Sequence, residues 1–195
     1  ILKSLIGYFI DLDPSPILVV QPTIEMGETF SKDRLAPMIR DTPALVGKVR
    51  DAKSRDSGNT ILKKHFPGGH LTIAGANSAA SLSSRPIRVL LCDEVDRYPP
   101  SAGTEGDPVN LARKRTATYR ARKKVALVST PTLKGHSRIE RAWLQSDQRR
   151  YFVPCPHCGH RHVLEWANVL VNEADLAQTA LVCPSCGVLI RDSDR

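Results

Sequence analysis

The sequence predicts an α/β fold: a parallel sheet with helices on both faces, followed by a small β domain that carries paired cysteines. Short apolar runs of strand length alternate with polar or glycine-containing segments long enough for helices, a pattern typical of parallel sheets. The runs lie at residues 17–23, 70–77, 87–94 and 124–130. Their apolar character is continuous, as in strands buried on both faces. From about residue 148 the pattern changes, so we predict domains at residues 1–148 and 149–195.

The connecting segments are predicted from spacing and from turn residues. Residues 1–11 carry leucine, isoleucine and phenylalanine at spacings of three and four, which predicts a helix. Residues 25–45 predict a helix broken by Pro37 and Pro43. Residues 66–70 contain paired glycines but no following lysine and hydroxyl residue, so a plain turn is expected there.

The charge of the chain favours a polyanionic partner such as nucleic acid. The formal net charge is +8 and the pI about 9.5. Residues 112–124 carry seven lysines or arginines and no acid, and within this run Arg113, Lys114 and Arg115 are candidate phosphate or DNA contacts. A solvated helix face accounts for the same run equally well. Aromatic residues make up only 5% of the chain, so stacking on unpaired bases is not indicated.

No segment approaches the roughly 18 to 20 apolar residues needed to cross a bilayer, and the first residues lack a signal-peptide cleavage pattern. We therefore expect a cytosolic protein without a membrane partner. The chain begins at Ile1 directly in an apolar helical pattern and stops just after a cysteine pair. These features predict an interior fragment of a longer protein, cut at both ends.

One apolar strand ends in carboxylates. Val89, Leu90 and Leu91 lead to Asp93 and Glu94. In P-loop NTPases an aspartate at the end of a buried strand holds Mg²⁺ directly or through water. The next carboxylate can orient and deprotonate the attacking water. This comparison predicts Asp93 as the magnesium-side acid and Glu94 as the catalytic base, whereas an acidic surface turn is the alternative.

Two other apolar runs end in polar tips that would lie at the same edge of a parallel sheet. One tip is Ser129-Thr130-Pro131, in the position where motor ATPases sense the γ-phosphate, and the other is Gln21-Pro22-Thr23. Each tip alone is accounted for by a turn, but three together predict a nucleotide site and a P-loop NTPase-like sheet. No G-x-x-x-x-G-K-[ST] phosphate loop occurs, so we expect it upstream of Ile1.

Two matching C-x-x-C-G segments predict a structural zinc ribbon. Cys155 and Cys158 are separated from Cys183 and Cys186 by 24 residues, and each pair presents two thiolates to one tetrahedral metal. Disulfides or a redox pair are less consistent with a cytosolic chain in which the motif occurs twice. Three histidines near the first pair are rival ligands: His157, His160 and His162. The fifth cysteine, Cys92, precedes Asp93 and is interpreted as a packing residue.

Four segments cover most of the chain in a specific order: GYFIDLDPSPILVVQPTIEMGETFSKDRLAPMIRDTPAL, VLLCDEVDRYP, ALVSTPT and VPCPHCGHRHVLEW. Together they resemble the large terminase subunit of tailed bacteriophages, of the lambda-like GpA type. The resemblance implies an ATP-driven motor that packages double-stranded DNA and a nuclease domain that cuts concatemers. It also implies ATP and Mg²⁺ as cofactors beside Zn²⁺. The implied partners are the small terminase subunit, the portal protein and further copies of the subunit, in the cytoplasm of a bacterial host.

The resemblance implies roles for individual residues. Asp93 and Glu94 match the Mg²⁺ and catalytic carboxylates. The coupling motif is matched by Ser129, Thr130 and Pro131, and a helicase-like segment near the DNA or nucleotide by Gln21, Pro22 and Thr23. Arg34 and Arg40 are weaker candidates for phosphate or interface contacts, since surface helix cations would look the same.

The sequence leaves the activity of this fragment and two alternative functions open. Without the phosphate loop and the nuclease domain, the fragment alone is expected not to hydrolyse ATP or cut DNA. A helicase-like translocase of repair or recombination is the first alternative, because it could share all three strand tips. A non-enzymatic zinc-ribbon protein that binds DNA is the second. The zinc ribbon could contact DNA or serve as a rigid spacer.

Overall fold

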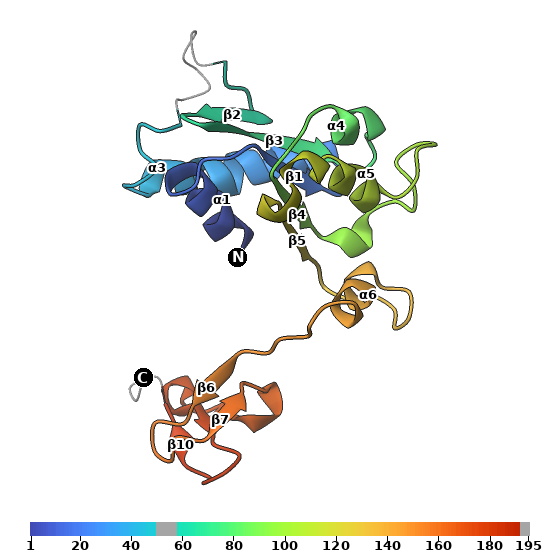
Figure 1. The fold of residues 1–195 in the computed structure, drawn as a ribbon. Helices are drawn as coiled ribbons and strands as arrows, with labels where there is room; N and C mark the ends of the chain where they lie inside the picture. The colour runs from blue at the N-terminus through green and yellow to red at the C-terminus, as the bar shows by residue number, and fades with distance from the viewer. Residues whose placement is uncertain (50–57, 192–195) are drawn as a thin grey trace. The chain divides into compact units, whose positions relative to one another are not determined.

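The computed structural model describes residues 1–49 and 58–191, and these form two compact units (Figure 1). Ile1–Trp143 form the sheet unit, and Leu144–Arg195 form the cysteine unit. The sequence pattern predicted the boundary at about residue 148, beyond the last apolar run. The division between the compact units lies a few residues earlier, at the last residue of the short helix Arg138–Leu144.

The sheet unit is built on a five-stranded sheet in the order β2-β3-β1-β4-β5. The strands are β1 (Ile17–Gln21), β2 (Lys63–Phe66), β3 (Gly69–Gly75), β4 (Val89–Asp93) and β5 (Lys124–Val128). β1, β3, β4 and β5 run parallel, as their continuous apolar runs predict. β2 pairs antiparallel with β3, so the predicted parallel sheet carries an antiparallel edge.

The antiparallel edge follows from the turn at residues 66–70, which was expected to be a plain turn. Phe66 and Gly69 are partners in the β2–β3 register, so only Pro67 and Gly68 connect the two strands. Gly68 has a φ of +80°, and a Cβ there would also lie 2.8 Å from Pro14. Glycine is therefore required at this position, and the turn fixes β2 beside β3.

Alternating residues of the central strands face two separate cores. Leu18, Val20 and Leu90 pack with residues of α4 and α5 on one face, whereas Ile17 and Val19 pack with residues of α1 on the other. The predicted cover of helices on both faces is thus confirmed. The helices of this unit are α1 (Leu2–Asp11), α2 (Ile24–Thr29), α3 (Ala36–Asp41), α4 (Ala79–Ser83), α5 (Pro108–Lys114) and α6 (Arg138–Leu144). Short 3₁₀ turns lie at Val95–Arg97 and Ala117–Arg122.

The prediction that Pro37 breaks the second helix was wrong. A π-helical turn, Phe30–Leu35, joins α2 to α3, and Pro37 lies at the start of α3. In this wider turn the N–H of Ala36 donates to the carbonyl of Ser31. Pro37 follows in the first turn of α3, where the N–H that proline lacks is not required, so the helix continues through it. The helix does end at Asp41, shortly before Pro43.

The cysteine unit contains short strands and little else of regular structure. β6 (Phe152–Pro154) pairs with β7 (Arg161–Val163), and β9 lies between β8 and β10. The remaining bounds are β8 (Val169–Leu170), β9 (Ala180–Val182) and β10 (Leu189–Ile190), with 3₁₀ turns at Trp166–Asn168 and Leu176–Gln178. The strands expected around the two cysteine pairs are confirmed.

Across the described residues, no helix has both the length and the apolar character required to span a bilayer.

The two-sided core makes a direct prediction for stability. Leu90 is 0% exposed in the central strand β4, so Leu90→Ala should lower the free energy of unfolding by about 2–5 kcal/mol, because it removes buried methyl groups and leaves a cavity. Leu133→Ala is the control, since Leu133 is 73% exposed and should change stability by less than about 0.5 kcal/mol. Urea denaturation followed by circular dichroism measures both. Equal effects of the two variants would contradict the assigned core.

Candidate nucleotide site and cysteine cluster

The carboxyl ends of three neighbouring parallel strands lie at one edge of the sheet. β1 pairs with β4, and β4 pairs with β5, so the residues after each strand are brought together. The Nε2 atom of Gln21 donates a hydrogen bond to Oδ2 of Asp93 over 3.0 Å. Gln21 is buried at 2% exposure, so this amide is fixed and in turn fixes the half-buried carboxylate.

Glu94 follows with an unusual backbone. Its φ of 53° and ψ of 49° lie in the left-handed region, which costs a residue with a side chain about 1–3 kcal/mol. The carboxylate is half-buried and lies 3.5 Å from Nε of the exposed Arg97. The left-handed turn reverses the chain directly after Asp93, and Glu94 is thereby presented beside it.

Asp96 ties this turn to the segment that follows β5. Its Oδ2 accepts hydrogen bonds from the N–H of Thr132 over 3.0 Å and from the Thr132 hydroxyl over 3.1 Å. Its Oδ1 accepts from the N–H of Ile139 over 2.8 Å, in the first turn of α6. The N–H of Asp96 donates to Oγ of Ser129 over 3.2 Å. Three hydrogen bonds thus join the turn after β4 to the segment after β5, and a fourth joins it to α6.

The pKa of Asp96 reflects these contacts. Burial alone would raise it, but hydrogen bonds from Ser137, Ile139 and Thr132 favour the ionised carboxylate and bring the pKa below 3.8. The aspartate is therefore charged near neutral pH, as an acceptor of several hydrogen bonds must be.

Two further side chains hold the residues after Asp96. The guanidinium of Arg138 donates to the carbonyls of Val95, Tyr98 and Pro99 over 2.7 to 3.1 Å and forms an ion pair with Asp107. The Tyr98 hydroxyl donates to the carbonyl of Val20 in β1 over 2.7 Å, and burial raises the pKa of this hydroxyl. The turn after β4 is therefore anchored both to β1 and to α6.

The remaining predicted residues are distributed more widely. Thr23 lies next to this edge, where its side chain accepts from the N–H of Met26 and caps α2, and Pro22 is buried. Thr130 and Pro131 are exposed beyond Ser129. Among the described residues, the arginine and lysine candidates form no hydrogen bond or ion pair with this edge: Arg34, Arg40, Arg113, Lys114 and Arg115. Arg40 instead pairs with its neighbour Asp41.

Sequence reasoning did not identify Asp96, Tyr98 or Arg138 as part of this site. Asp96 stands two residues after Glu94, so the sequence alone places it near the predicted base. Its hydrogen-bond partners, however, come from a segment more than thirty residues later. The expected role of Cys92 as a packing residue is confirmed. It is fully buried beneath the site, and burial raises the pKa of its thiol to about 12.

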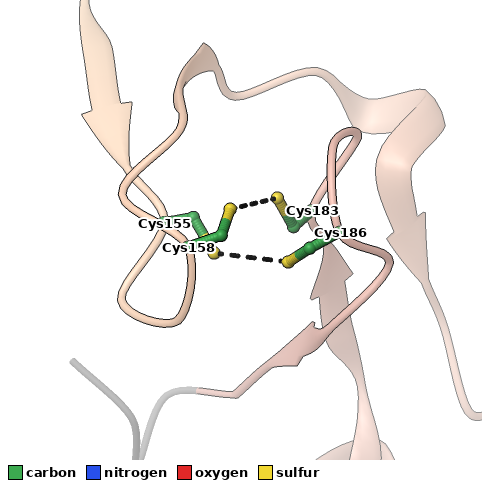
Figure 2. Close-up of side chains that lie close together, drawn as sticks. All are labelled: Cys155, Cys158, Cys183 and Cys186. Carbon is green, nitrogen blue, oxygen red and sulfur yellow. Dashed lines mark hydrogen bonds between the residues drawn. The ribbon is translucent and has the colours of Figure 1, made fainter.

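The four paired cysteines meet in the cysteine unit (Figure 2). Their sulfur atoms all lie within 4.8 Å of one another. The Sγ atoms of Cys155 and Cys186 are 4.0 Å apart, and those of Cys158 and Cys183 are 3.8 Å apart. Tetrahedral zinc with Zn–S bonds of about 2.3 Å requires sulfur atoms about 3.8 Å apart, so the cluster has suitable dimensions. Disulfide bonds of about 2.05 Å are excluded by the same distances.

The two halves of the cluster share one backbone design. The N–H of Gly159 donates to the carbonyl of Cys155, and the N–H of Gly187 donates to the carbonyl of Cys183. Both glycines have positive φ, 73° and 71°. In the second half, backbone N–H groups, first that of Cys186, lower the pKa of Cys183 to about 6 and so favour a thiolate.

The neighbouring histidines do not join this cluster. The group of potential metal ligands found in the described chain contains the four cysteines alone. The ring of His162 is buried and stacks with that of His160 at 6.1 Å between centroids, while His157 is exposed.

Comparisons with known proteins agree on one family. The family model of the phage terminase large subunit gpA, ATPase domain, matches residues 1–195. The terminase large subunit of Enterobacteria phage P21 is 32% identical over 171 residues, and that of Escherichia phage lambda is 30% identical over 171 residues. In each case the match covers 85% of this chain but only 26% of the relative.

One solved structure has a similar fold. The ATPase domain of the Thermus phage P74-26 large terminase superposes with a TM-score of 0.52 over 84% of this chain and 66% of that chain, at 13% identity. This likeness concerns the fold alone.

The Asp96 contacts make a pH-dependent prediction. Asp96→Asn should lower the free energy of unfolding by about 0.5–2 kcal/mol, because Asn cannot replace both carboxylate acceptors and one donor in the first turn of α6 loses its partner. The folded-state pKa of Asp96 is below 3.8, so its stabilisation is fully present above that pH and is lost as the pH falls through the lowered value. Denaturation at several pH values should therefore show a difference between parent and variant that shrinks in acid.

The exposed Asp33→Asn provides the matched control, with little change at any pH. A pH-independent difference for Asp96→Asn would mean that the charge of this carboxylate does not stabilise the turn.

Proposed function

This chain belongs to the family of phage terminase large subunits of the gpA type, and we propose that it is part of the ATPase that drives DNA into a viral capsid. The observation that carries this proposal is the edge of the sheet where Gln21 holds Asp93 beside Glu94. The chain spans about a quarter of its curated relatives, 26% of each, so the activity belongs to the longer protein.

Asp93 would hold Mg²⁺ of a bound Mg–ATP. The Gln21 amide occupies Oδ2, and among the described residues no donor bonds to the other carboxylate oxygen, Oδ1, which therefore suits a metal ion or its water. One or two carboxylates are enough, because Mg²⁺ takes its other ligands from phosphates and water. Bound in this way, Mg²⁺ would neutralise charge on the phosphate oxygens during transfer.

Glu94 would act as the general base. Its carboxylate follows Asp93 directly, and the left-handed backbone fixes the direction in which it leaves the strand. A carboxylate held there can orient a water and accept its proton at an Oε atom. The 3.5 Å ion pair with the exposed Arg97 would be easily released when nucleotide binds, because exposed pairs contribute little energy.

Ser129, with Thr130 and Pro131, would couple hydrolysis to movement. Ser129 accepts from the N–H of Asp96, and Asp96 in turn accepts from Thr132 and from the start of α6. A change in the position of Glu94 would therefore move the segment after β5. Gln21, Pro22 and Thr23 would connect the same edge to α2.

The cysteine unit would be a zinc ribbon. Its described core of buried residues contains Cys155, Cys183 and Ile190, which is too small to hold the unit together without a metal. The four sulfur atoms at tetrahedral spacing support one structural Zn²⁺.

The longer protein would act on double-stranded DNA in the cytoplasm of the bacterial host, with ATP as fuel. Its partners would be the small terminase subunit, the capsid portal and further copies of itself. Its nuclease domain would lie outside this chain. Arg34, Arg40 and the basic residues of α5 would serve as contacts to these polyanions or to neighbouring subunits.

Replacement of the base tests the proposal. In the full-length protein, Glu94→Gln should lower ATP hydrolysis at least about 100-fold, because it removes the proton acceptor, while nucleotide affinity stays within a few-fold. The exposed Glu105→Gln is the control and should hydrolyse normally. Steady-state hydrolysis with and without duplex DNA, beside nucleotide binding, measures both.

Normal turnover by Glu94→Gln would show that another group is the base. Strand separation by the parent would favour the helicase-like alternative, and a parent that binds DNA but no nucleotide would favour the zinc-ribbon DNA-binding alternative.

The metal is tested independently of hydrolysis. Native mass spectrometry of the parent should show one zinc per chain, and Cys158→Ser should lose it, because three thiolates and a hydroxyl bind Zn²⁺ more weakly. His160→Ala should keep the metal, since His160 lies outside the cluster. A parent without zinc, or a Cys158→Ser variant that retains it, would overturn the ribbon.

A further inference from the structure

α4 approaches β3 away from the carboxyl ends of the parallel strands (Figure 1). Residues of both elements line a small cavity there. Its volume is about 160 Å³. Leu18, Leu82 and Ile87 contribute apolar surface, and the polar lining consists of Lys63, His70, Thr72, Ser81, Ser84 and Arg85. The cavity thus combines cationic side chains with three hydroxyl groups.

Within the described part of the chain, the two cations of this cavity form no ion pair: no such pair involves Lys63 or Arg85. No aspartate or glutamate occurs from Gly58 to Cys92. His65 and His70 are directly opposed in the β2–β3 register, with ring centroids 6.2 Å apart. Clustered like charges destabilise one another, so an anion would relieve them.

The environment of His70 reflects this crowding of positive charge. Burial lowers the pKa of His70, and the nearby cations of Arg85, His65 and Lys63 lower it further. The imidazole is therefore neutral near neutral pH, and its ring N–H can act as an additional hydrogen-bond donor.

The size of the cavity limits the ligand to a small group. Pockets for nucleotides and similar molecules usually measure about 300–1,000 Å³, and this one is well below that range. Lysine, arginine and hydroxyl groups are the usual partners of phosphate oxygens. One phosphate group fits the volume, and Lys63, Arg85 and the three hydroxyl groups among the lining residues supply partners for its oxygens, although most of the cavity surface is apolar.

We propose that this cavity holds a backbone phosphate of duplex DNA. The inference rests on the proposed function, in which DNA is the substrate of the motor, and it adds a contact surface that lies apart from Asp93 and Glu94. A net charge of +8 provides the general attraction, and the cavity provides a defined seat for one phosphate.

Further cations lie on α5, which packs against α4. The guanidinium of Arg115, at the end of α5, donates to the carbonyl of Ser83 over 3.2 Å, next to Ser84 and Arg85. Arg113 and Lys114 are exposed on the same helix. The phosphates that follow the first along a DNA strand would meet these side chains.

The test compares DNA binding by charge-matched variants of the full-length protein. Lys63→Ala with Arg85→Ala should weaken binding to a fluorescent duplex at least about tenfold and reduce the magnitude of the log K against log salt slope by about 1, because one phosphate contact is lost and about 0.9 counterion is released per phosphate contact. Lys3→Ala with Lys32→Ala removes the same charge from exposed positions and should change affinity less than about twofold. Fluorescence anisotropy across a series of salt concentrations measures both.

Equal affinities and slopes for the two double variants would overturn the proposal. Basal ATP hydrolysis separates this failure from failure of the proposed function, because the cavity variant should hydrolyse ATP like the parent in the absence of DNA. A parent that neither hydrolyses ATP nor binds DNA would refute both.

Two further measurements separate loss of the phosphate contact from loss of folding. If the double variant is unstable by circular dichroism, Arg85→Gln alone changes an exposed side chain and should still weaken DNA binding and lower the slope, by less than about 1. Inorganic phosphate at about 10 mM, roughly the level at which a single weak phosphate site is filled, is then added as a competitor. At matched ionic strength it should weaken DNA binding by the parent more than DNA binding by the variant. Equal competition would overturn the assignment of the cavity to phosphate.

Discussion

The carboxylate of Asp96 is the contact on which the candidate nucleotide site depends. It accepts hydrogen bonds from Thr132 and from the start of α6, and so closes the chain after β4 onto the chain after β5. The left-handed backbone of Glu94 costs about 1–3 kcal/mol and persists only where its surroundings hold it. The Arg138 guanidinium and the Tyr98 hydroxyl complete that support from α6 and β1.

The Asp96 contacts also link the turn after β4 to the segment after β5. Asp96 lies two residues after Glu94 and bonds to Ser129 and Thr132, so it connects the turn that holds Glu94 to the segment after β5. A motor needs such a connection between chemistry and movement, and bistable hydrogen-bonded elements are a common means of making it. The cysteine unit differs from the sheet unit, because its core of buried residues is small. Four sulfur atoms at metal-binding distances lie where a larger domain would have an apolar interior.

The sequence predicted much of this fold because its central strands are buried on both faces. The runs around Ile17 and Val89 are continuously apolar, as is the run of the half-buried edge strand around Val125, and that signal needs no tertiary information. β2 was missed because Lys63, Lys64 and His65 are polar and gain their pairing only from the Pro67-Gly68 turn. The prediction of a break at Pro37 failed because the π-helical turn that accommodates this proline depends on long-range packing of the helix.

The site was predictable only in part. Asp93, Glu94 and Ser129 were predicted because strand ends carry function in parallel sheets, and the structure brings them to one edge of the sheet, while their roles stay predictions. The role of Asp96 and the hydrogen bond from Gln21 depend on register between strands that are far apart in sequence, and no local pattern encodes it. The grouping of the four cysteines was predicted from the sequence, because paired C-x-x-C-G segments set both the type and the spacing of the sulfur atoms.

The most direct test of the central claim is the structure of the full-length protein with Mg²⁺ and a non-hydrolysable ATP analogue. We expect a metal ion bound to Asp93 directly or through one water, with Glu94 within about 3.2 Å of a water that faces the γ-phosphate. A nucleotide bound away from the ends of β1 and β4, or a Glu94 carboxylate turned out of the site, would contradict the assigned roles.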